Sequence, residues 1–192
     1  MAVARTLFAE RGYAGTALED LVEQAGMTRG ALYHQYRDKR DLFLAVFDAV
    51  ERDLGEHVAA AIGAETDPWE ALRTGARAFL EACNDLAVRR IVLIDGPSVL
   101  GWEEWRRIDG QYSLGMVRLG LEANAAAGNL SRDNIEALTH LIVGALNEAA
   151  LAVASAPEQA GAHADYAAAL DQILDALRAQ AATPPHTQRA GS

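Results

Sequence analysis

Apolar residues recur every three to four positions through most of this 192-residue chain, and no stretch alternates apolar and polar residues with period two. A repeat near 3.6 residues is typical of helices that bury one face, whereas alternation is typical of half-buried strands. Alanine and leucine abound and β-branched runs are scarce, which also favours helices. The sequence therefore predicts an all-α fold.

Capping residues divide the N-terminal part into short helices. Thr16 stands three residues before Glu19, the spacing of a capping box in which each side chain binds a free backbone amide at the other residue. Thr28 and Asp38 are suited to begin helices, and Gly26 to form a tight turn. The helices expected here cover 3–10, the stretch from 16 to the turn, 28–35 and 38–54, and the glycines of "RGYAG" are suited to left-handed caps after the first.

The rest of the chain is divided in the same way. Asp67 is suited to cap a helix that has Pro68 at its first position and runs to about residue 85. The stretch "DGPS" is expected to end the segment "VRRIVLID", and Ser131 to cap a long apolar helix that reaches about residue 154. Further helices are expected near 111–126 and over 162–181, and the polar, Pro-containing residues 182–192 are expected to be disordered. We therefore expect an N-terminal domain over 1–50 and a larger domain over 51–181.

The segment "MTRGALYHQYRDK", residues 27–39, places cations and aromatic rings in a short helix. Two helices joined by a turn at Gly26 fit the helix-turn-helix arrangement, in which the second helix enters the DNA major groove. Thr28 and the free amides near it can bind phosphate, and Arg29 can make two hydrogen bonds to guanine. The small residues Gly30 and Ala31 allow close approach, and polar tips that can reach phosphates or base edges belong to Tyr33, His34 and Lys39.

The distribution of charge favours the same function. The whole chain carries a net charge of −10, of which residues 1–50 contribute only −1. An acidic body behind a more basic face would orient the approach to DNA. The alternative is a solvated helical hairpin with ordinary surface charges, because short helix-turn-helix patterns also recur by chance. Spacing alone leaves both interpretations open.

The order of residues over the first 50 positions favours DNA binding. The stretch "ARTLFAERGYAGTALEDLVEQAGMTRGALYHQYRDKRDLFLAVFDAV" closely resembles the N-terminal DNA-binding domain of the TetR family of transcriptional regulators. The resemblance implies a three-helix helix-turn-helix domain joined by a fourth helix to a larger helical body for ligand binding and dimerisation. It also implies that the family's DNA-contacting positions are occupied here by Thr16, Thr28, Arg29, Gly30, Ala31, Tyr33, His34, Gln35 and Lys39.

The last two helices favour a homodimer. Their sequences, "LTHLIVGALNEAALAVA" and "YAAALDQILDALRA", carry more apolar surface than one small subunit can bury. Pairing with a symmetry mate would form a four-helix contact. Such a dimer would also place two recognition helices about 34–36 Å apart, over a palindromic operator in double-stranded DNA.

Pairs of aromatic, flexible and polar residues in the body are candidates for a small-molecule pocket. Each pair shares one face of a helix because its members lie three, four or seven positions apart. Such side chains are typical of ligand pockets, but for any one of them ordinary core packing is the favoured alternative. The candidates are Phe79 with Cys83, Trp102 with Trp105, Tyr112 with Met116, and His140 with Asn147.

Motifs for catalysis, metal binding and export are missing from the sequence. "GPSVLG" departs from the G-x-S-x-G pattern of a nucleophile elbow, and the five histidines are scattered without H-E-x-x-H or paired cysteines. The single cysteine cannot form an internal disulfide, and no signal peptide or bilayer-spanning run is evident. We expect a cytoplasmic protein that needs no cofactor or metal, does not enter a membrane and is not an enzyme.

These features together predict a ligand-responsive, DNA-binding transcriptional regulator. The expected mode is a repressor that a small-molecule inducer of unknown identity releases from its operator, with the fourth helix acting as the hinge. The alternative is a helical small-molecule-binding protein or enzyme that carries a vestigial DNA-binding domain.

Overall fold

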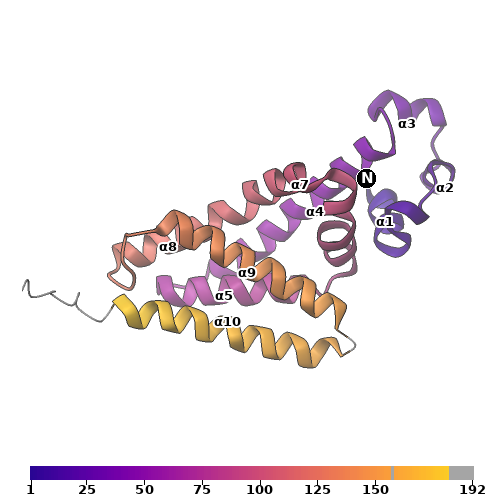
Figure 1. Cartoon of the computed structure of the whole chain (residues 1–192). Helices are drawn as coiled ribbons and strands as arrows, with labels where there is room; N and C mark the ends of the chain where they lie inside the picture. The colour runs from indigo at the N-terminus through magenta and orange to yellow at the C-terminus, as the bar shows by residue number, and fades with distance from the viewer. Residues whose placement is uncertain (157, 182–192) are drawn as a thin grey trace, which may run out of the picture.

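The computed structural model describes residues 1–156 and 158–181, and every element within these ranges is helical, as predicted (Figure 1). The prediction for the tail, 182–192, falls outside the described residues. A small N-terminal domain lies at one end of the molecule, and α4 runs from it into a larger helical body. In chain order the elements are α1 Ala2–Gly15, α2 Leu18–Gln24, α3 Arg29–Gln35, α4 Lys39–Ile62, α5 Pro68–Ala82, η1 Val88–Asp95, α6 Gly96–Leu100, α7 Trp102–Asp109, η2 Gly110–Leu114, α8 Gly115–Ala126, α9 Ile135–Ser155 and α10 Gln159–Ala181, where η marks a π-helical turn.

An aromatic cluster holds the N-terminal domain together. The ring of Phe43 lies edge-on to Phe8 and to Tyr13, at 5.2 Å between centroids in both pairs. Leu21 of α2 and Leu32 of α3 are buried against the same core. Aromatic pairs in such edge-on geometry add to the stabilisation that burial provides. The short helices α2 and α3 are therefore fixed by tertiary packing.

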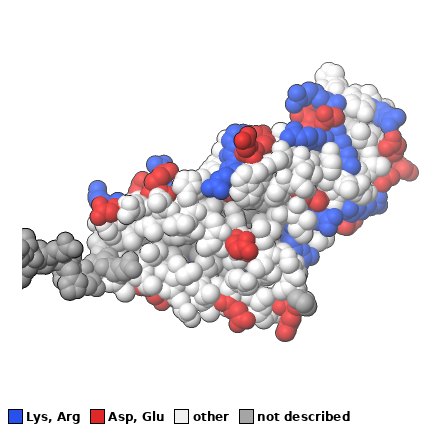
Figure 2. Space-filling view, in the orientation of Figure 1, with Lys and Arg blue, Asp and Glu red and all other residues white. Residues whose placement is uncertain are grey.

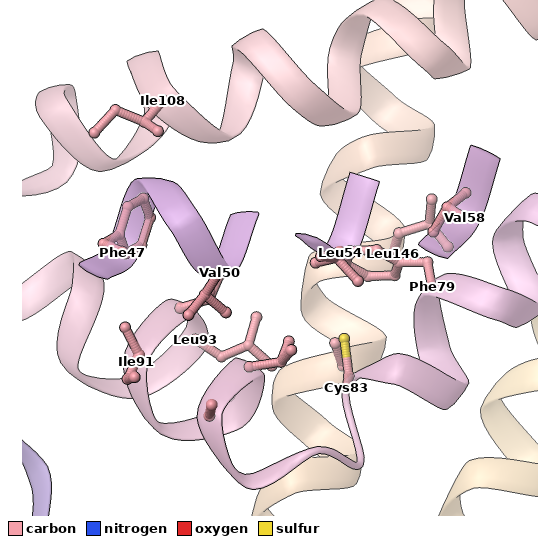
Figure 3. Close-up of a cluster of buried hydrophobic side chains, with 14 of the residues drawn as sticks. Phe47, Val50, Leu54, Val58, Phe79, Cys83, Ile91, Leu93, Ile108 and Leu146 are labelled. Carbon is pink, nitrogen blue, oxygen red and sulfur yellow. The ribbon is translucent and has the colours of Figure 1, made fainter. Parts of the chain in front are cut away.

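Helix α4 connects the two domains and extends further than predicted, to Ile62. Its apolar side chains keep the 3.6-residue period that the sequence indicates, and those from Phe47 to Val58 pack into the body core (Figure 3). Gly55 lies inside this helix, and Tyr112 and Met116 pack beside it with enough room for a Cβ at ordinary contact distances. One continuous helix thus joins the N-terminal domain to the middle of the body.

The break that we expected at the "DGPS" stretch of the body is absent from the described residues. Gly96, in the "DGPS" stretch, has helical dihedral angles, and η1 continues directly into α6. The chain turns instead at Gly101, which adopts φ +85°. Likewise α7, η2 and α8 follow one another without a loop. The prediction was wrong because packing decides the conformation here: a Cβ on Gly96 would lie 2.7 Å from Phe47 and 2.9 Å from Trp105, so the glycine permits close helix contact.

Local capping predictions have mixed outcomes. The side chains of Thr28, Asp38 and Asp67 cap α3, α4 and α5 as predicted. Ser131 does not cap α9, which begins four residues later after Asn134 in a left-handed conformation. The Ser131 hydroxyl bonds Asp133 instead. A hydroxyl near a helix start can satisfy either a helix or a turn, and sequence does not decide between them.

Helix α9 corrects the statement that no run is long and apolar enough to span a bilayer. By length and composition, Ile135–Ser155 is sufficient. Core helices meet the same criterion, and α9 packs against α5, α8 and α10. Its apolar character is therefore weak evidence for a membrane span.

Candidate nucleic-acid interface and ligand cavity

Helix α3 presents nearly all of its side chains to solvent. Its first turn is closed by Thr28, whose hydroxyl accepts a hydrogen bond from the Ala31 amide at 3.1 Å. Leu32 is its one buried residue and anchors it to the domain. The exposed residues include all the contact positions predicted on this helix, namely Thr28, Arg29, Gly30, Ala31, Tyr33, His34 and Gln35. The face is thus available to a DNA groove, and contact with DNA stays a prediction.

Cations gather around α3. Figure 2 shows Lys and Arg side chains over the end of the molecule that carries the N-terminal domain, with acidic side chains among them. Arg29 forms an ion pair with Glu19 of α2, and the two side chains are 61% and 64% exposed. Solvent screens an ion pair so exposed, which leaves it worth little. The Arg29 guanidinium can therefore exchange Glu19 for a base or phosphate at small cost.

Lys39 occupies a defined position at the start of α4. Its Nζ atom lies 4.3 Å from the centroid of the Tyr13 ring, a cation–π contact. Partial burial lowers the pKa of Lys39 below its usual value. The ring restricts the rotamers of this long side chain, so less entropy would be lost when it binds a phosphate.

Thr16 does not fit its predicted roles. It is fully buried, and its hydroxyl donates to the Gly12 carbonyl at 2.8 Å, with the Leu7 carbonyl a second acceptor at 3.2 Å. Helix α2 begins after Ala17 without a side-chain cap, so Thr16 and Glu19 form no capping box. The Thr16 side chain instead ties the chain after Gly12 back to α1, where Gly12 adopts φ +71°. Its hydroxyl is thus unavailable to DNA in this conformation.

A polar joint connects the N-terminal domain to the body. Arg40 donates to the carbonyls of Val99 and Leu100, at 3.2 and 3.0 Å, and so binds the C-terminal end of α6. Asp95, 9% exposed, accepts from the Tyr13 amide at 2.7 Å. Charged side chains that bond backbone groups far away in sequence leave no local pattern, which is why sequence reasoning missed this joint. The orientation of the N-terminal domain therefore depends on the position of η1 and α6.

The body contains a large apolar cavity. Its volume is about 410 Å³, within the range typical of small-molecule sites. Helices α4, α5, α8 and α9 supply most of the wall, including Val58 of α4 and Leu146 of α9. Among the predicted ligand-binding residues, three line it: Phe79, Met116 and Asn147. Because α4 supplies part of the wall, a molecule that fills the cavity contacts α4 directly.

The polar side chains of the cavity wall meet at a buried carboxyl group. Ser113 and Asn147 are the wall residues with polar side chains. The Ser113 hydroxyl donates to Asp109 at 3.0 Å, and the Asn147 amide donates to the other Asp109 oxygen at 3.4 Å. Burial raises the pKa of Asp109, and these two hydrogen bonds oppose the shift. Sequence reasoning missed both Asp109 and Ser113. A possible signal for Asp109 was its position directly after the apolar Ile108 in a helix.

A second buried carboxyl group lies nearby on α4. Glu51 is 1% exposed, and its Oε1 atom has no hydrogen-bond partner among the described residues. Burial raises the pKa of Glu51 to about 8, and the charges of Asp109 and Asp48 add to the effect. Two acidic side chains, Glu51 and Asp109, are thus buried between α4 and the α7–η2 segment, and Glu51 favours its protonated form near neutral pH.

Other predicted ligand residues lie in a smaller cleft of about 150 Å³ beside α7 and α9. Trp102, Trp105, His140 and Asn147 all line it. The two tryptophans stack at 5.1 Å, and the buried indole N–H of Trp105 donates to the Val92 carbonyl at 3.0 Å. Trp105 is thus also a core residue, whereas Trp102 and His140 are exposed. The cleft and the cavity share Asn147.

Cys83 and Tyr112 line neither the cavity nor the small cleft. Cys83 is buried near Phe79 (Figure 3), and burial raises the pKa of its thiol to about 12, so thiolate chemistry is suppressed. The Tyr112 hydroxyl donates to Asp48 at 2.9 Å and links η2 to α4. In the described residues, no group of three His, Cys, Asp or Glu side chains is placed to hold a metal ion.

Two family models match this chain. One, described as "Bacterial regulatory proteins, tetR family", covers residues 1–46, and the other, "Tetracyclin repressor-like, C-terminal domain", covers residues 69–177. The two matches correspond to the N-terminal domain and to most of the body.

Relatives and solved structures agree with these matches. The Transposon Tn10 TetC protein of Escherichia coli is 26% identical over 131 residues, which span 68% of this chain and 63% of that protein. A TetR-family transcriptional regulator from Pectobacterium atrosepticum has 35% identity and a TM-score of 0.81, over 92% of this chain and 90% of that one. The transcriptional regulator FadR from Bacillus subtilis, solved with stearoyl-CoA, has the same fold at 17% identity and a TM-score of 0.70, covering 92% and 94% of the two chains.

Proposed function

Because this chain belongs to the TetR family of bacterial regulatory proteins, we propose that it is a transcriptional repressor that a small molecule releases from DNA. One observation carries the proposal: every contact position predicted on α3 is exposed, while Leu32 is the one buried residue of the helix. A helix packed as core would bury more of its surface, so this face is free for a partner. The side chains on this face can bind phosphates and base edges, so duplex DNA is the proposed partner.

The proposed assembly is a homodimer that binds a palindromic operator through one α3 from each subunit. Figure 2 shows a broad face over α9 and α10 with few charged side chains. Leu141 is 69% exposed there and Ile173 50%, and both line an apolar groove of about 160 Å³ between these helices. Apolar side chains so exposed favour burial against a second copy, and α9 and α10 from two subunits would form a four-helix contact.

Ligand release is proposed to act through α4 and α6. Helix α4 lines the cavity at Val58, Ala59 and Ile62, and begins at Lys39 in the N-terminal domain. Arg40 couples the start of α4 to the end of α6. A ligand that binds the released conformation more tightly than the DNA-bound one shifts the population toward dimers whose two α3 helices no longer have the spacing that the operator requires. B. subtilis FadR, solved with stearoyl-CoA, is a relative of the same fold that binds a small molecule.

The proposal includes no enzymatic activity, cofactor or metal, because the cavity wall offers apolar contacts and two polar side chains that a binding site alone can use. A role on chromosomal DNA places the protein in the cytoplasm.

The experiment is a fluorescence-anisotropy titration of the full chain against DNA segments that flank its own reading frame, at two salt concentrations. Random DNA of equal length is the control. We expect saturable binding to one palindromic segment, tighter than to random DNA by about a thousandfold or more. Equal, weak and salt-sensitive binding to all segments would leave only the electrostatic contribution and refute sequence-specific regulation at this locus.

A matched pair of variants locates the interface. Arg29→Ala removes an exposed cation of α3, and Arg118→Ala removes one of similar exposure, 53%, on α8. Weaker specific binding in the first variant alone is the expected result. Equal effects of both would indicate that total charge, and not the α3 surface, governs binding.

A further inference from the structure

Most side-chain hydrogen-bond donors of the cavity wall are already in use, because Asp109 accepts the single hydroxyl hydrogen of Ser113 and one of the two amide hydrogens of Asn147. Ser113 and Asn147 supply the polar side-chain groups of the wall, and both direct a donor to Asp109. What remains for a ligand is the Ser113 oxygen, through its lone pairs, the Asn147 amide oxygen and the second Asn147 N–H. The two oxygens are hydrogen-bond acceptors. Because each side chain also donates to the Asp109 carboxyl group, polarisation makes its oxygen a stronger acceptor. Two acceptors thus face one remaining N–H at this end of the cavity, which favours a ligand that brings its own donor.

The charges around the cavity also favour a ligand that carries a hydrogen-bond donor. Among the described residues, the wall contains no Lys, Arg or His side chain. No Lys or Arg nitrogen of the described residues lies within 4.0 Å of an Asp109 oxygen. Asp109 lies one hydrogen bond behind the wall, and Glu51 is close enough to have its pKa raised by the Asp109 charge. Burial raises the pKa of Asp109 and the charge of the exposed Arg106 opposes this shift, but Arg106 forms no ion pair with Asp109. An anionic group would therefore approach a buried carboxyl that has no paired cation, whereas an ammonium would supply one.

We propose that the cavity selects an apolar molecule that carries an amine, with the ammonium bound by the Ser113 and Asn147 oxygens in front of Asp109. The proposal rests on the proposed function only in taking this cavity as the effector site. The remaining wall is aliphatic and aromatic, from Val58, Leu72 and Phe79 to Val143 and Leu146. It suits a compact hydrocarbon body, since a cavity of about 410 Å³ holds a bicyclic ring with a short side chain.

The test compares three probes that share one hydrocarbon body and differ in one polar group. They are 1-naphthylmethylamine, 1-naphthalenemethanol and 1-naphthoate, each titrated into the full-length protein by calorimetry at pH 7. Charge-assisted hydrogen bonds exceed neutral ones, so we expect the amine to bind about tenfold more tightly than the alcohol, and naphthoate the least tightly. Equal affinities, tightest binding of naphthoate, or binding of none of the three would overturn the proposal.

Two variants locate the effect. Asp109→Asn keeps the acceptor for Ser113 and removes the charge, and it should reduce the amine's advantage over the alcohol to about twofold while leaving the alcohol's affinity unchanged. Glu122→Gln is the control, because it removes an exposed carboxylate from α8 and should change nothing. An amine advantage that survives in Asp109→Asn would overturn the assignment to this end of the cavity. The order of the three probes on the unaltered protein needs no variant, so a folding defect in Asp109→Asn does not remove the test.

Binding is measured without DNA, so it is separable from regulation. If the amine binds selectively but does not release operator DNA, the cavity assignment stands and the proposed release mechanism fails. If the DNA titration succeeds but naphthoate binds better than the amine, the repressor stands and the ligand class is wrong.

Discussion

Glu51 allows a quantitative test of how the body core is built. It is the most deeply buried carboxyl group in the described part of the chain, and its Oε1 atom lacks a hydrogen-bond partner there. Burial and the neighbouring acids raise its pKa from 4.5 to about 8. In the unfolded chain it titrates near the ordinary value. Folding therefore favours the protonated side chain.

The pH dependence follows from this difference. Between pH 4.5 and 8 the folded protein holds a proton on Glu51 that the unfolded chain has released, so the free energy of unfolding falls as pH rises through this window. Below 4.5 both states are protonated and the stabilisation is complete. At about 1.4 kcal/mol per pKa unit, this group should lower the stability by about 3 kcal/mol between pH 5 and pH 8.

The perturbation is Glu51→Gln, which keeps the size of the side chain and removes its titration. Urea unfolding at pH 5, 6, 7 and 8, at one fixed protomer concentration, gives the free energy of unfolding of each protein. The stability of the unaltered protein should fall by about 3 kcal/mol more than that of the variant across this range. Glu122→Gln, at an exposed carboxylate, should run parallel to the unaltered protein.

A constant offset between the Glu51→Gln and unaltered proteins across all four pH values would refute the reasoning. It would mean that Glu51 is ionised in the folded state, with solvent or a cation satisfying it. A difference of the opposite sign would mean that the folded state binds the carboxylate form more tightly than the unfolded chain does.

Three further predictions concern the N-terminal domain and its attachment. Arg29→Ala should relax base preference at one position in each half-site at a cost of about 1–3 kcal/mol, measured by anisotropy on single-base operator variants; equal weakening on random DNA would contradict a base contact. Tyr33→Phe and Lys39→Ala should weaken operator binding with little change in melting temperature, and unchanged affinity in both would remove these phosphate assignments. Gly12→Ala should lower the free energy of unfolding by about 1–3 kcal/mol, because φ +71° with ψ 172° is a region for glycine; undiminished stability in urea would refute that strain.

Local chemistry explains which helix boundaries could be predicted. Thr28, Asp38 and Asp67 cap helices through bonds to amides two or three residues away, so the necessary information lies within one short window. The apolar period of α4 is equally local and identified the face that Figure 3 shows buried in the core. Boundaries that depend only on such contacts follow from the sequence.

The errors arose where a distant contact decides the conformation. Gly96 continues a helix because Phe47 and Trp105 pack closely against it, and no sequence window contains all three residues. Thr16 fits a capping box by spacing, but carbonyls of α1 accept its hydroxyl. In both cases tertiary packing overrode a local preference of comparable strength.

The candidate site was predictable in part for a related reason. Periodicity identifies the face on which Phe79, Met116 and Asn147 lie, but it does not distinguish a face that meets empty space from one that meets other side chains. Cys83, the C-cap residue of the helix that carries Phe79, is packed and does not line the cavity, although the spacing treats both alike. A cavity arises from the arrangement of several helices, so its outline appears only when they are assembled.

The position of α4 makes the two sites depend on each other. From Lys39 to Val58 the helix spans about 28 Å, at 1.5 Å per residue, so one continuous hydrogen-bonded rod joins the DNA-binding domain to the cavity wall. The domain cannot simply follow α4, because Arg40 and Asp95 also bind it to the η1–α6 segment. A ligand that shifts α4 relative to that segment must therefore reorient the domain or break these bonds. Either outcome changes the position of α3, which is how an apolar cavity in the body can control a polar surface at the other end of the molecule.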